Sequence, residues 1–183
     1  GQAEANNTQT GLEMAKQYTQ EFKENSKTTA KHFGSLVTQG NNGRMKPVNT
    51  LTIDVLNKIT GDSSLFGLNS NQVVLGMMTA PEIWQGLRII KVKHPALQEK
   101  LGAKEGHIAF NDAFNEQGRY ILKTDVEEAV RKDPKNMGTY DKDIIRLDER
   151  LNITYMVFNG SIARLFPKPD DPSNTWYPPL IAL

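Results

Sequence analysis

The chain has 183 residues, of which 38% are hydrophobic and 23% charged, and its formal net charge is +1. These totals are typical of one globular domain, and they argue against a disordered chain and against a uniformly basic surface for nucleic acid. The absence of cysteine excludes a disulfide framework, a thiol nucleophile and a thiolate metal site. No apolar run reaches the roughly 18 residues of a membrane-spanning helix, and no signal peptide is apparent.

The N-terminal part of the chain predicts a tail, a helix and a hairpin. Residues 1–8 are polar and are expected to form a disordered tail. A weakly amphipathic helix is predicted over 9–33. The segments 35–39 and 45–48 are predicted to be extended, and the glycine- and asparagine-rich residues 40–43 between them indicate a tight turn.

Two helices are predicted in the middle of the chain. The first runs from Asn49 or Thr50 to Thr60, with Leu51, Val55 and Ile59 on one face. The second covers residues 71–79 after a Ser70 cap. It is almost wholly apolar, which predicts a helix buried at the centre of the fold. Pro81 then begins a short helical turn.

The second half of the chain predicts short strands between helices. Strands are expected at 87–92, 106–110 and 161–166. Helices are expected from His94-Pro95 to Leu101, from a capping box at 124–127 to Lys132, and from Tyr140 to Phe158. In the last helix, apolar side chains repeat at three- and four-residue steps at Ile144, Leu147, Leu151, Tyr155 and Phe158.

The predicted fold is therefore α+β, predominantly helical, with two or three short strands from 35–48, 87–92, 107–110 and 161–166. One compact domain is expected over residues 9–178. The ending 179–183 turns apolar and is expected to begin an exit segment.

No catalytic or metal site can be assigned from the sequence. Nucleophile, phosphate-loop and zinc motifs are absent, and adjacent acidic residues in a helix point to different sides. Charged residues of the last helix, including Asp141, Asp148 and Arg150, suit a solvated face. Arg150 could alternatively pair across the fold with a buried carboxylate.

His94 and His107 are weak candidates for haem ligands, because histidine is a good axial ligand of haem iron. The alternative is an ordinary surface or capping role, and it is favoured because ligation needs a closed apolar pocket. Trp84 and Trp176 lie near prolines and are interpreted either as anchors against the core or as binding hot spots, with the anchor role favoured. If the domain docks a partner, Arg44, Lys46, Trp84 and Trp176 are the candidate contacts.

Several blocks of the sequence resemble one protein family. The blocks are His32-Phe33-Gly34-x-Leu36, residues 43–51, residues 67–73, residues 110–114 and the terminal region from Asp148. Together they resemble the extracytoplasmic portion of system II cytochrome c biogenesis proteins, the fused haem lyases, over residues 30–178. The resemblance implies a domain at the periplasmic face of the bacterial inner membrane.

The family attaches haem to the cysteines of apocytochrome c, with haem held by membrane helices and a tryptophan-rich loop. Neither feature is present in this chain, so no catalytic role is carried over to its residues. The resemblance implies a non-enzymatic accessory domain that binds no haem itself. The implied partners are the membrane-embedded remainder of the same polypeptide, apocytochrome c and thiol-reductant proteins. The alternatives are a domain that itself delivers haem, and a stand-alone periplasmic protein that binds a small ligand.

Overall fold

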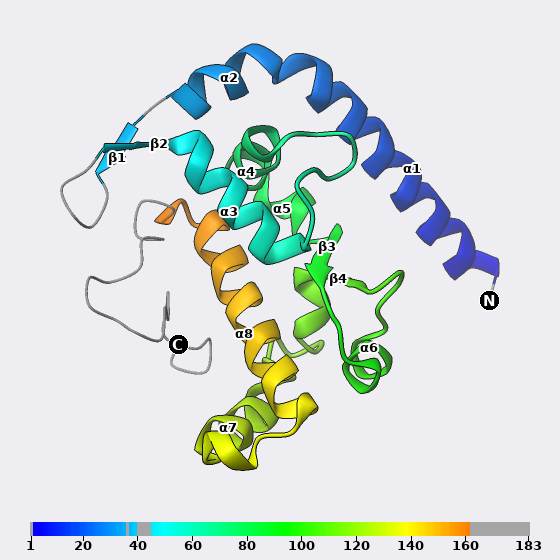
Figure 1. Ribbon diagram of the computed structural model, residues 1–183. Coiled ribbons are helices and arrows are strands. Elements are labelled where there is room, and N and C mark those ends of the chain that lie inside the picture. The colour runs from blue at the N-terminus through cyan, green and yellow to red at the C-terminus, as the bar shows by residue number, and fades with distance from the viewer. Residues whose placement is uncertain (1, 36, 40–44, 162–183) are drawn as a thin grey trace.

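The computed structural model describes residues 2–35, 37–39 and 45–161 of the chain (Figure 1). Eight α-helices are described: α1 (Gln2–Asn25), α2 (Lys27–Ser35), α3 (Val48–Thr60), α4 (Ser70–Thr79), α5 (Pro81–Trp84), α6 (Pro95–Leu101), α7 (Lys123–Arg131) and α8 (Thr139–Phe158). The strands form two antiparallel pairs: β1 (Val37–Gln39) with β2 (Met45–Pro47), and β3 (Arg88–Lys91) with β4 (His107–Ala109). The predicted α+β fold with predominant helix is confirmed.

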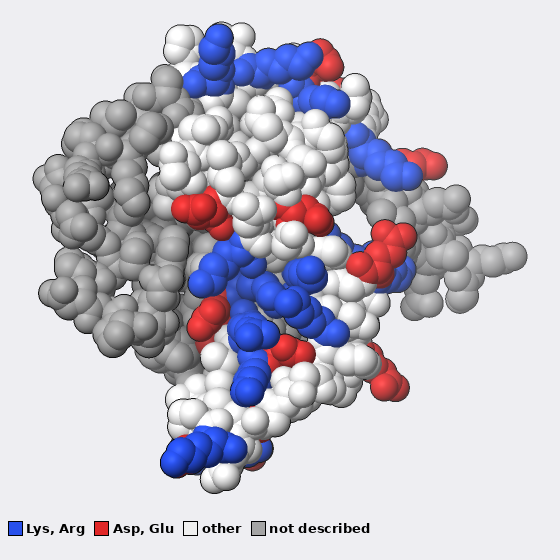
Figure 2. Space-filling model, in the orientation of Figure 1, with Lys and Arg blue, Asp and Glu red and all other residues white. Residues whose placement is uncertain are grey.

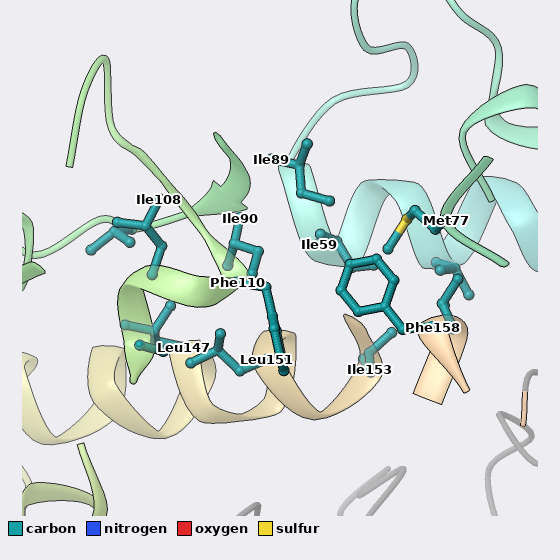
Figure 3. Close-up of a cluster of buried hydrophobic side chains, with 14 of the residues drawn as sticks. Ile59, Met77, Ile89, Ile90, Ile108, Phe110, Leu147, Leu151, Ile153 and Phe158 are labelled. Carbon is teal, nitrogen blue, oxygen red and sulfur yellow. The ribbon is translucent and has the colours of Figure 1, made fainter. Parts of the chain in front are cut away.

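The last helix, α8, lies at the centre of the fold and packs against α3, α4, α7 and β3 (Figure 1). Its side chains Leu147, Leu151 and Phe158 meet Ile59 of α3 and other apolar groups in one continuous core (Figure 3). The predicted apolar stripe is confirmed except at Tyr155, which is 39% exposed.

Apolar residues that were predicted to face the core in the two middle helices are buried. Leu51, Val55 and Ile59 of α3 are all buried, as are Val73 and Met77 of α4. The ends of these helices differ from the prediction, because α3 begins at Val48.

The cap of α4 is Asn69 and not Ser70. The Asn69 side chain accepts a hydrogen bond from the backbone N–H of Gln72 at 2.9 Å, and the Gln72 side chain accepts one from the backbone N–H of Asn69 at 3.1 Å. This reciprocal pair satisfies two N–H groups that a helix start leaves open.

The helix predicted over 9–33 is two helices, α1 and α2, which break at Ser26. The Gln72 side-chain amide donates to the Lys23 carbonyl and to the Ser26 hydroxyl, both at 3.1 Å. A side chain that inserts into the ladder of helical hydrogen bonds breaks or bends a helix. The segment 1–8, for which a disordered tail was expected, contains the start of α1 at Gln2. In Figure 1 the N-terminal part of α1 projects beyond the body.

The second half of the chain follows the prediction with one clear exception. The capping box at 124–127 is wrong, because α7 begins at Lys123 and its cap position is Leu122, which makes no side-chain cap bond. Leu122 is fully buried, so core packing fixes this helix start in place of a polar cap. The strand expected at 161–166 lies outside the described residues, apart from Ser161.

Candidate functional site

Trp84 is a core residue. Its side chain is fully buried, and the ring of Phe22 in α1 meets it edge-on with centroids 6.4 Å apart. Its indole lies so close to Gly76 of α4 that a Cβ there would be 2.8 Å from the ring. The anchor interpretation is therefore correct for Trp84, and a docking role is not, because the side chain offers no exposed surface to a partner.

Of the other three docking candidates, the structure describes only Lys46. Arg44 and Trp176 lie outside the described residues. Lys46 lies in β2, where it pairs with Thr38 of β1. The two segments predicted to be extended pair as antiparallel strands, and the turn predicted at 40–43 lies outside the described residues.

His94 caps the start of α6. Its Nδ1 accepts a hydrogen bond from the backbone N–H of Ala96 at 3.1 Å, and its ring meets Tyr140 edge-on at 5.2 Å. A neutral imidazole whose Nδ1 accepts carries its proton on Nε2. Iron ligation through Nε2 would therefore require the other tautomer and would remove the cap bond.

His107 joins two backbone carbonyl groups at the end of α3. Its Nδ1 lies 3.0 Å from the Glu105 carbonyl oxygen, and its Nε2 lies 3.1 Å from that of Thr60. Carbonyl oxygens only accept, so a neutral ring makes one of these bonds and a protonated ring makes both. Both ring nitrogens thus lie against backbone carbonyl oxygens, and coordination of iron through either nitrogen would displace it from its carbonyl.

A group of cationic side chains converges on this same end of α3. Arg150 of α8 donates from Nε to the Lys58 carbonyl at 3.2 Å and from Nη1 to the Lys91 carbonyl at 3.1 Å. A cation at the C-terminal end of a helix satisfies open carbonyl groups and opposes the negative end of the helix dipole. The carboxylate partner considered for Arg150 is replaced by these two carbonyls.

Three further cations surround Arg150. The side chain of Lys91 lies over Gly61, where its Nζ would be 2.9 Å from an added Cβ. Arg146 lies one turn before Arg150 on α8 and is 55% exposed. We call Lys58, Lys91, Arg146 and Arg150 the basic cluster. Figure 2 shows Lys and Arg side chains gathered at the middle of this face, with acidic side chains around them.

Two acidic side chains lie near the basic cluster. Arg146 and Asp143 are 3.7 Å apart, and Lys58 and Glu149 are 3.9 Å apart. The pKa of Arg150 is lowered from its ordinary value, first because its guanidinium is partly removed from water and then because Arg146 is near. The cluster leaves little local pattern in the sequence, because its members come from α3, β3 and α8. Only the four-residue spacing of Arg146 and Arg150 was visible locally.

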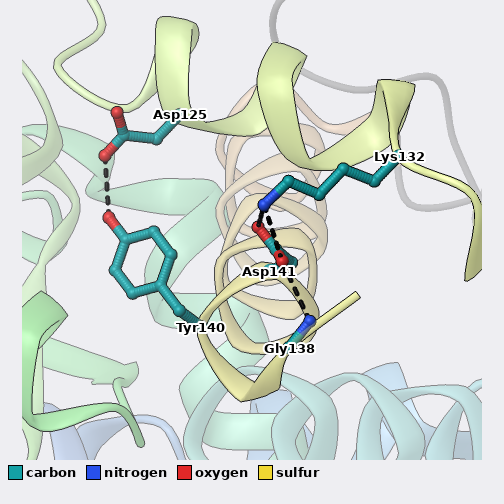
Figure 4. Close-up of polar contacts among 5 residues, drawn as sticks. All are labelled: Asp125, Lys132, Gly138, Tyr140 and Asp141. Atoms are coloured by element: carbon teal, nitrogen blue, oxygen red, sulfur yellow. Dashed lines mark hydrogen bonds and ion pairs between the residues drawn. The ribbon is translucent and has the colours of Figure 1, made fainter. Parts of the chain in front are cut away.

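A second polar group joins α7 to α8 (Figure 4). Asp141 accepts two hydrogen bonds from the Lys132 ammonium, at 2.9 and 3.0 Å, and one from the backbone N–H of Gly138. Asp125 accepts from the Tyr140 hydroxyl and from Lys100, both at 2.7 Å.

The physical effect of these bonds is structural. The bond from Lys132, followed by that from Gly138, lowers the pKa of Asp141, and the bond from Lys100 is the largest cause that lowers the pKa of Asp125. Burial, followed by the bond to Asp125, raises the pKa of Tyr140 to about 12. Each acid is held charged and the phenol is held neutral at pH 7, which suits ion pairs and not proton transfer.

Other kinds of site are not apparent in the part of the chain that the structure describes. No group of three or more histidine and acidic side chains there could hold a metal ion, and no helix there has the length and apolarity to cross a membrane. An open, shallow hollow on α2 is lined by Lys27, Thr28, Lys31 and His32. It differs from the deep apolar pocket that a small-ligand protein would need.

No protein-family model matches the chain. Over 160 residues, which are 87% of this chain, it is 44% identical to Protein NrfI of Wolinella succinogenes. The matched part is 18% of NrfI, so the chain spans less than a fifth of that relative's length. The chain is therefore a homologue of one segment of NrfI.

Proposed function

We propose that this chain is the extracytoplasmic domain of a system II cytochrome c biogenesis protein, where it acts as a scaffold or docking module at the periplasmic face of the inner membrane. The observation that carries the proposal is the 44% identity to one segment of the much longer NrfI. The resemblance of several sequence blocks to the system II family is a second observation that supports the proposal.

In this proposal the chemistry of haem attachment is done by the membrane-embedded remainder of the polypeptide. The domain is not itself an enzyme and binds no haem. It contacts that remainder, apocytochrome c and, for the delivery of reduced thiols, thiol-reductant proteins. Two polar groups described above support this assignment, because Asp125 is bonded to Tyr140 and Asp141 to Lys132, and His107 and Arg150 contact backbone carbonyls.

The experiment replaces the segment that corresponds to residues 9–161 by a flexible linker in the full-length protein. We expect membrane insertion to be kept and the yield of holocytochrome c, measured by haem staining, to fall severely. A yield equal to that of the intact protein would overturn the proposal.

The alternative, a domain that delivers haem, has one specific candidate residue. His94 keeps an Nε2 that makes no hydrogen bond within the described part of the chain, whereas both nitrogens of His107 contact carbonyls. Titration of the purified chain with haem, followed at the Soret band, decides between the two. A stoichiometric shift that His94→Ala abolishes and His32→Ala does not would favour haem delivery over a scaffold.

A further inference from the structure

The basic cluster combines a fixed cation, Arg150, with one exposed cation, Arg146, and two half-buried ones, Lys58 and Lys91. Arg150 is half-buried, and two carbonyl groups hold its guanidinium in place through Nε and Nη1. Its Nη2 makes no hydrogen bond within the described residues. A guanidinium that is already immobilised loses little conformational entropy when its remaining donors bind a carboxylate, and planar pairing of this kind is the preferred use of arginine.

The neighbouring cations extend the same surface. Lys91 forms no ion pair with any residue that the structure describes, and Arg146 is more than half exposed, with Asp143 as a distant partner at 3.7 Å. Exposed ion pairs of this length contribute little, so these cations remain able to bind other anions. Two carbonyl groups fix the guanidinium of Arg150, and Lys91 on β3 and Arg146 one turn earlier on α8 add charge beside this fixed group.

The size of the cluster points to the kind of partner. The chain as a whole carries a net charge of +1, and the acidic side chains Asp143 and Glu149 lie beside the cluster. A bilayer of anionic lipid is best bound by a broad basic face, as is the phosphate backbone of a nucleic acid. A small basic area within a mixed surface suits a few carboxylates at fixed positions, with electrostatic steering of the encounter.

We propose that the basic cluster of Lys58, Lys91, Arg146 and Arg150 is a docking surface for an acidic segment of a partner protein, bound through its carboxylates. This inference rests on the proposed function and names the surface that would do the docking. It replaces Trp84, which is buried, and it does not depend on Arg44 or Trp176.

The test uses the purified full chain and a fluorescent peptide of glutamate and glycine, with the matching glutamine peptide as the neutral probe. Fluorescence anisotropy measures binding at low salt. We expect saturable binding of the acidic peptide that weakens as salt is added, and no binding of the neutral peptide.

The double variant Lys91→Gln and Arg146→Gln removes two charges while it keeps polar side chains of similar length. It is expected to weaken binding about tenfold, given the strength of multiple charge pairs. The matched control, Lys123→Gln and Arg131→Gln, removes two exposed cations of α7 and is expected to change binding less than about twofold. Thermal melts check that both variants fold.

Three results would overturn the inference. One is no saturable binding of the acidic peptide, and another is an equal loss in both double variants, which would indicate a general effect of net charge. The third is cluster-dependent binding to vesicles that contain phosphatidylglycerol without binding to the peptide, which would assign the surface to a membrane. All three leave the domain-replacement test of the proposed function untouched, so the two proposals can fail separately.

Discussion

Asp141 shows how one side chain links the sequence to stability at the α7–α8 junction. Its charged form is bound by Lys132 and by the Gly138 N–H, so its folded pKa lies below the unfolded value of about 3.9. A carboxyl of this kind stabilises the fold above its unfolded pKa, and the contribution is lost as the pH falls through the folded pKa.

The variant Asp141→Asn removes this titration. We expect it to have a lower free energy of unfolding than the parent at pH 7, with the difference shrinking as the pH falls below the unfolded pKa of about 3.9 and through the lower folded pKa of Asp141, where the parent carboxyl becomes protonated as well. Urea denaturation between pH 7 and pH 2.5 measures it. Glu116→Gln, at an exposed position without a described partner, is the control and should follow the parent throughout. A difference that is constant with pH would contradict the linkage.

Gly76 is a second residue whose substitution is expected to change the stability of the fold. An added Cβ would lie 2.8 Å from the Cε2, Cζ2 and Nε1 atoms of the fully buried Trp84. Alanine gains up to about 1 kcal/mol over glycine in a helix, but overpacking a rigid core costs about 1–3 kcal/mol. Since the indole must move as a whole, we expect the clash to prevail.

The prediction for Gly76→Ala is a net loss of about 1–2 kcal/mol and a shift of the Trp84 fluorescence maximum. Equilibrium urea unfolding measures the loss. Gly86→Ala is the matched control, because the atom that its Cβ meets is 3.6 Å away, an ordinary contact. Gly76→Ala that is as stable as the parent would show that the indole can move aside.

At the scale of elements, one side chain, Gln72, connects α4 to the junction of α1 and α2. It completes the capping box of α4, and its amide donates to both Lys23 and Ser26 at the break between α1 and α2. Gln72 is 4% exposed, so water does not replace these bonds when they are removed. Each buried group that loses its partner costs about 1–3 kcal/mol.

We therefore expect Gln72→Ala to lower the free energy of unfolding by about 3 kcal/mol and to raise amide hydrogen exchange across 18–33. Gln117→Ala, an exposed loop position, is the control and should change neither quantity. Gln72→Glu separates the two roles, because it keeps the acceptor for Asn69 and loses the donors. Unchanged exchange in α1 and α2 with Gln72→Ala would show that the aromatic contacts of Tyr18 and Phe22 hold these helices instead.

The same residue shows why some elements were predictable and others were not. The apolar residues predicted from local periodicity in α3 and α8 are buried except Tyr155, but the same helices also bury polar residues such as Thr52 and Asn152 that the periodicity did not indicate. The break at Ser26 depends on a side chain 46 residues further along the chain. Asp148 was expected on a solvated face, but the Tyr120 hydroxyl donates to it at 2.7 Å and the carboxylate is buried. Contacts of this range leave no local pattern.

At the scale of the whole molecule, the basic cluster could not be predicted from the sequence for the same reason, because its residues come together only in the folded chain. Composition gives a net charge near zero, and this hides the convergence of Lys58, Lys91, Arg146 and Arg150 from different elements. The sequence instead drew attention to Trp84, because aromatic residues near prolines are conspicuous. Burial depends on the assembled fold, and here it turns that side chain inward.

The position of α8 predicts that the described body unfolds as one unit. Leu151 of α8 is fully buried in the single hydrophobic core, which extends from Leu51 of α3 to Val126 of α7. Replacing a buried leucine by alanine costs about 2–5 kcal/mol. If α8 joins the two ends of the fold, Leu151→Ala lowers the stability of both ends by the same amount.

Two probes test this at opposite ends. In a Trp176→Phe background, Trp84 is the only tryptophan and reports on α4 and α5. Because the chain has no cysteine, Val130→Cys, at a 49% exposed position of α7, accepts a single thiol-reactive dye. We expect one shared urea midpoint for both probes, lowered equally by Leu151→Ala and little by the exposed control Ile53→Ala. Midpoints that separate would mean that α7 and its ion pairs unfold independently, in which case α8 does not transmit stability between the two ends.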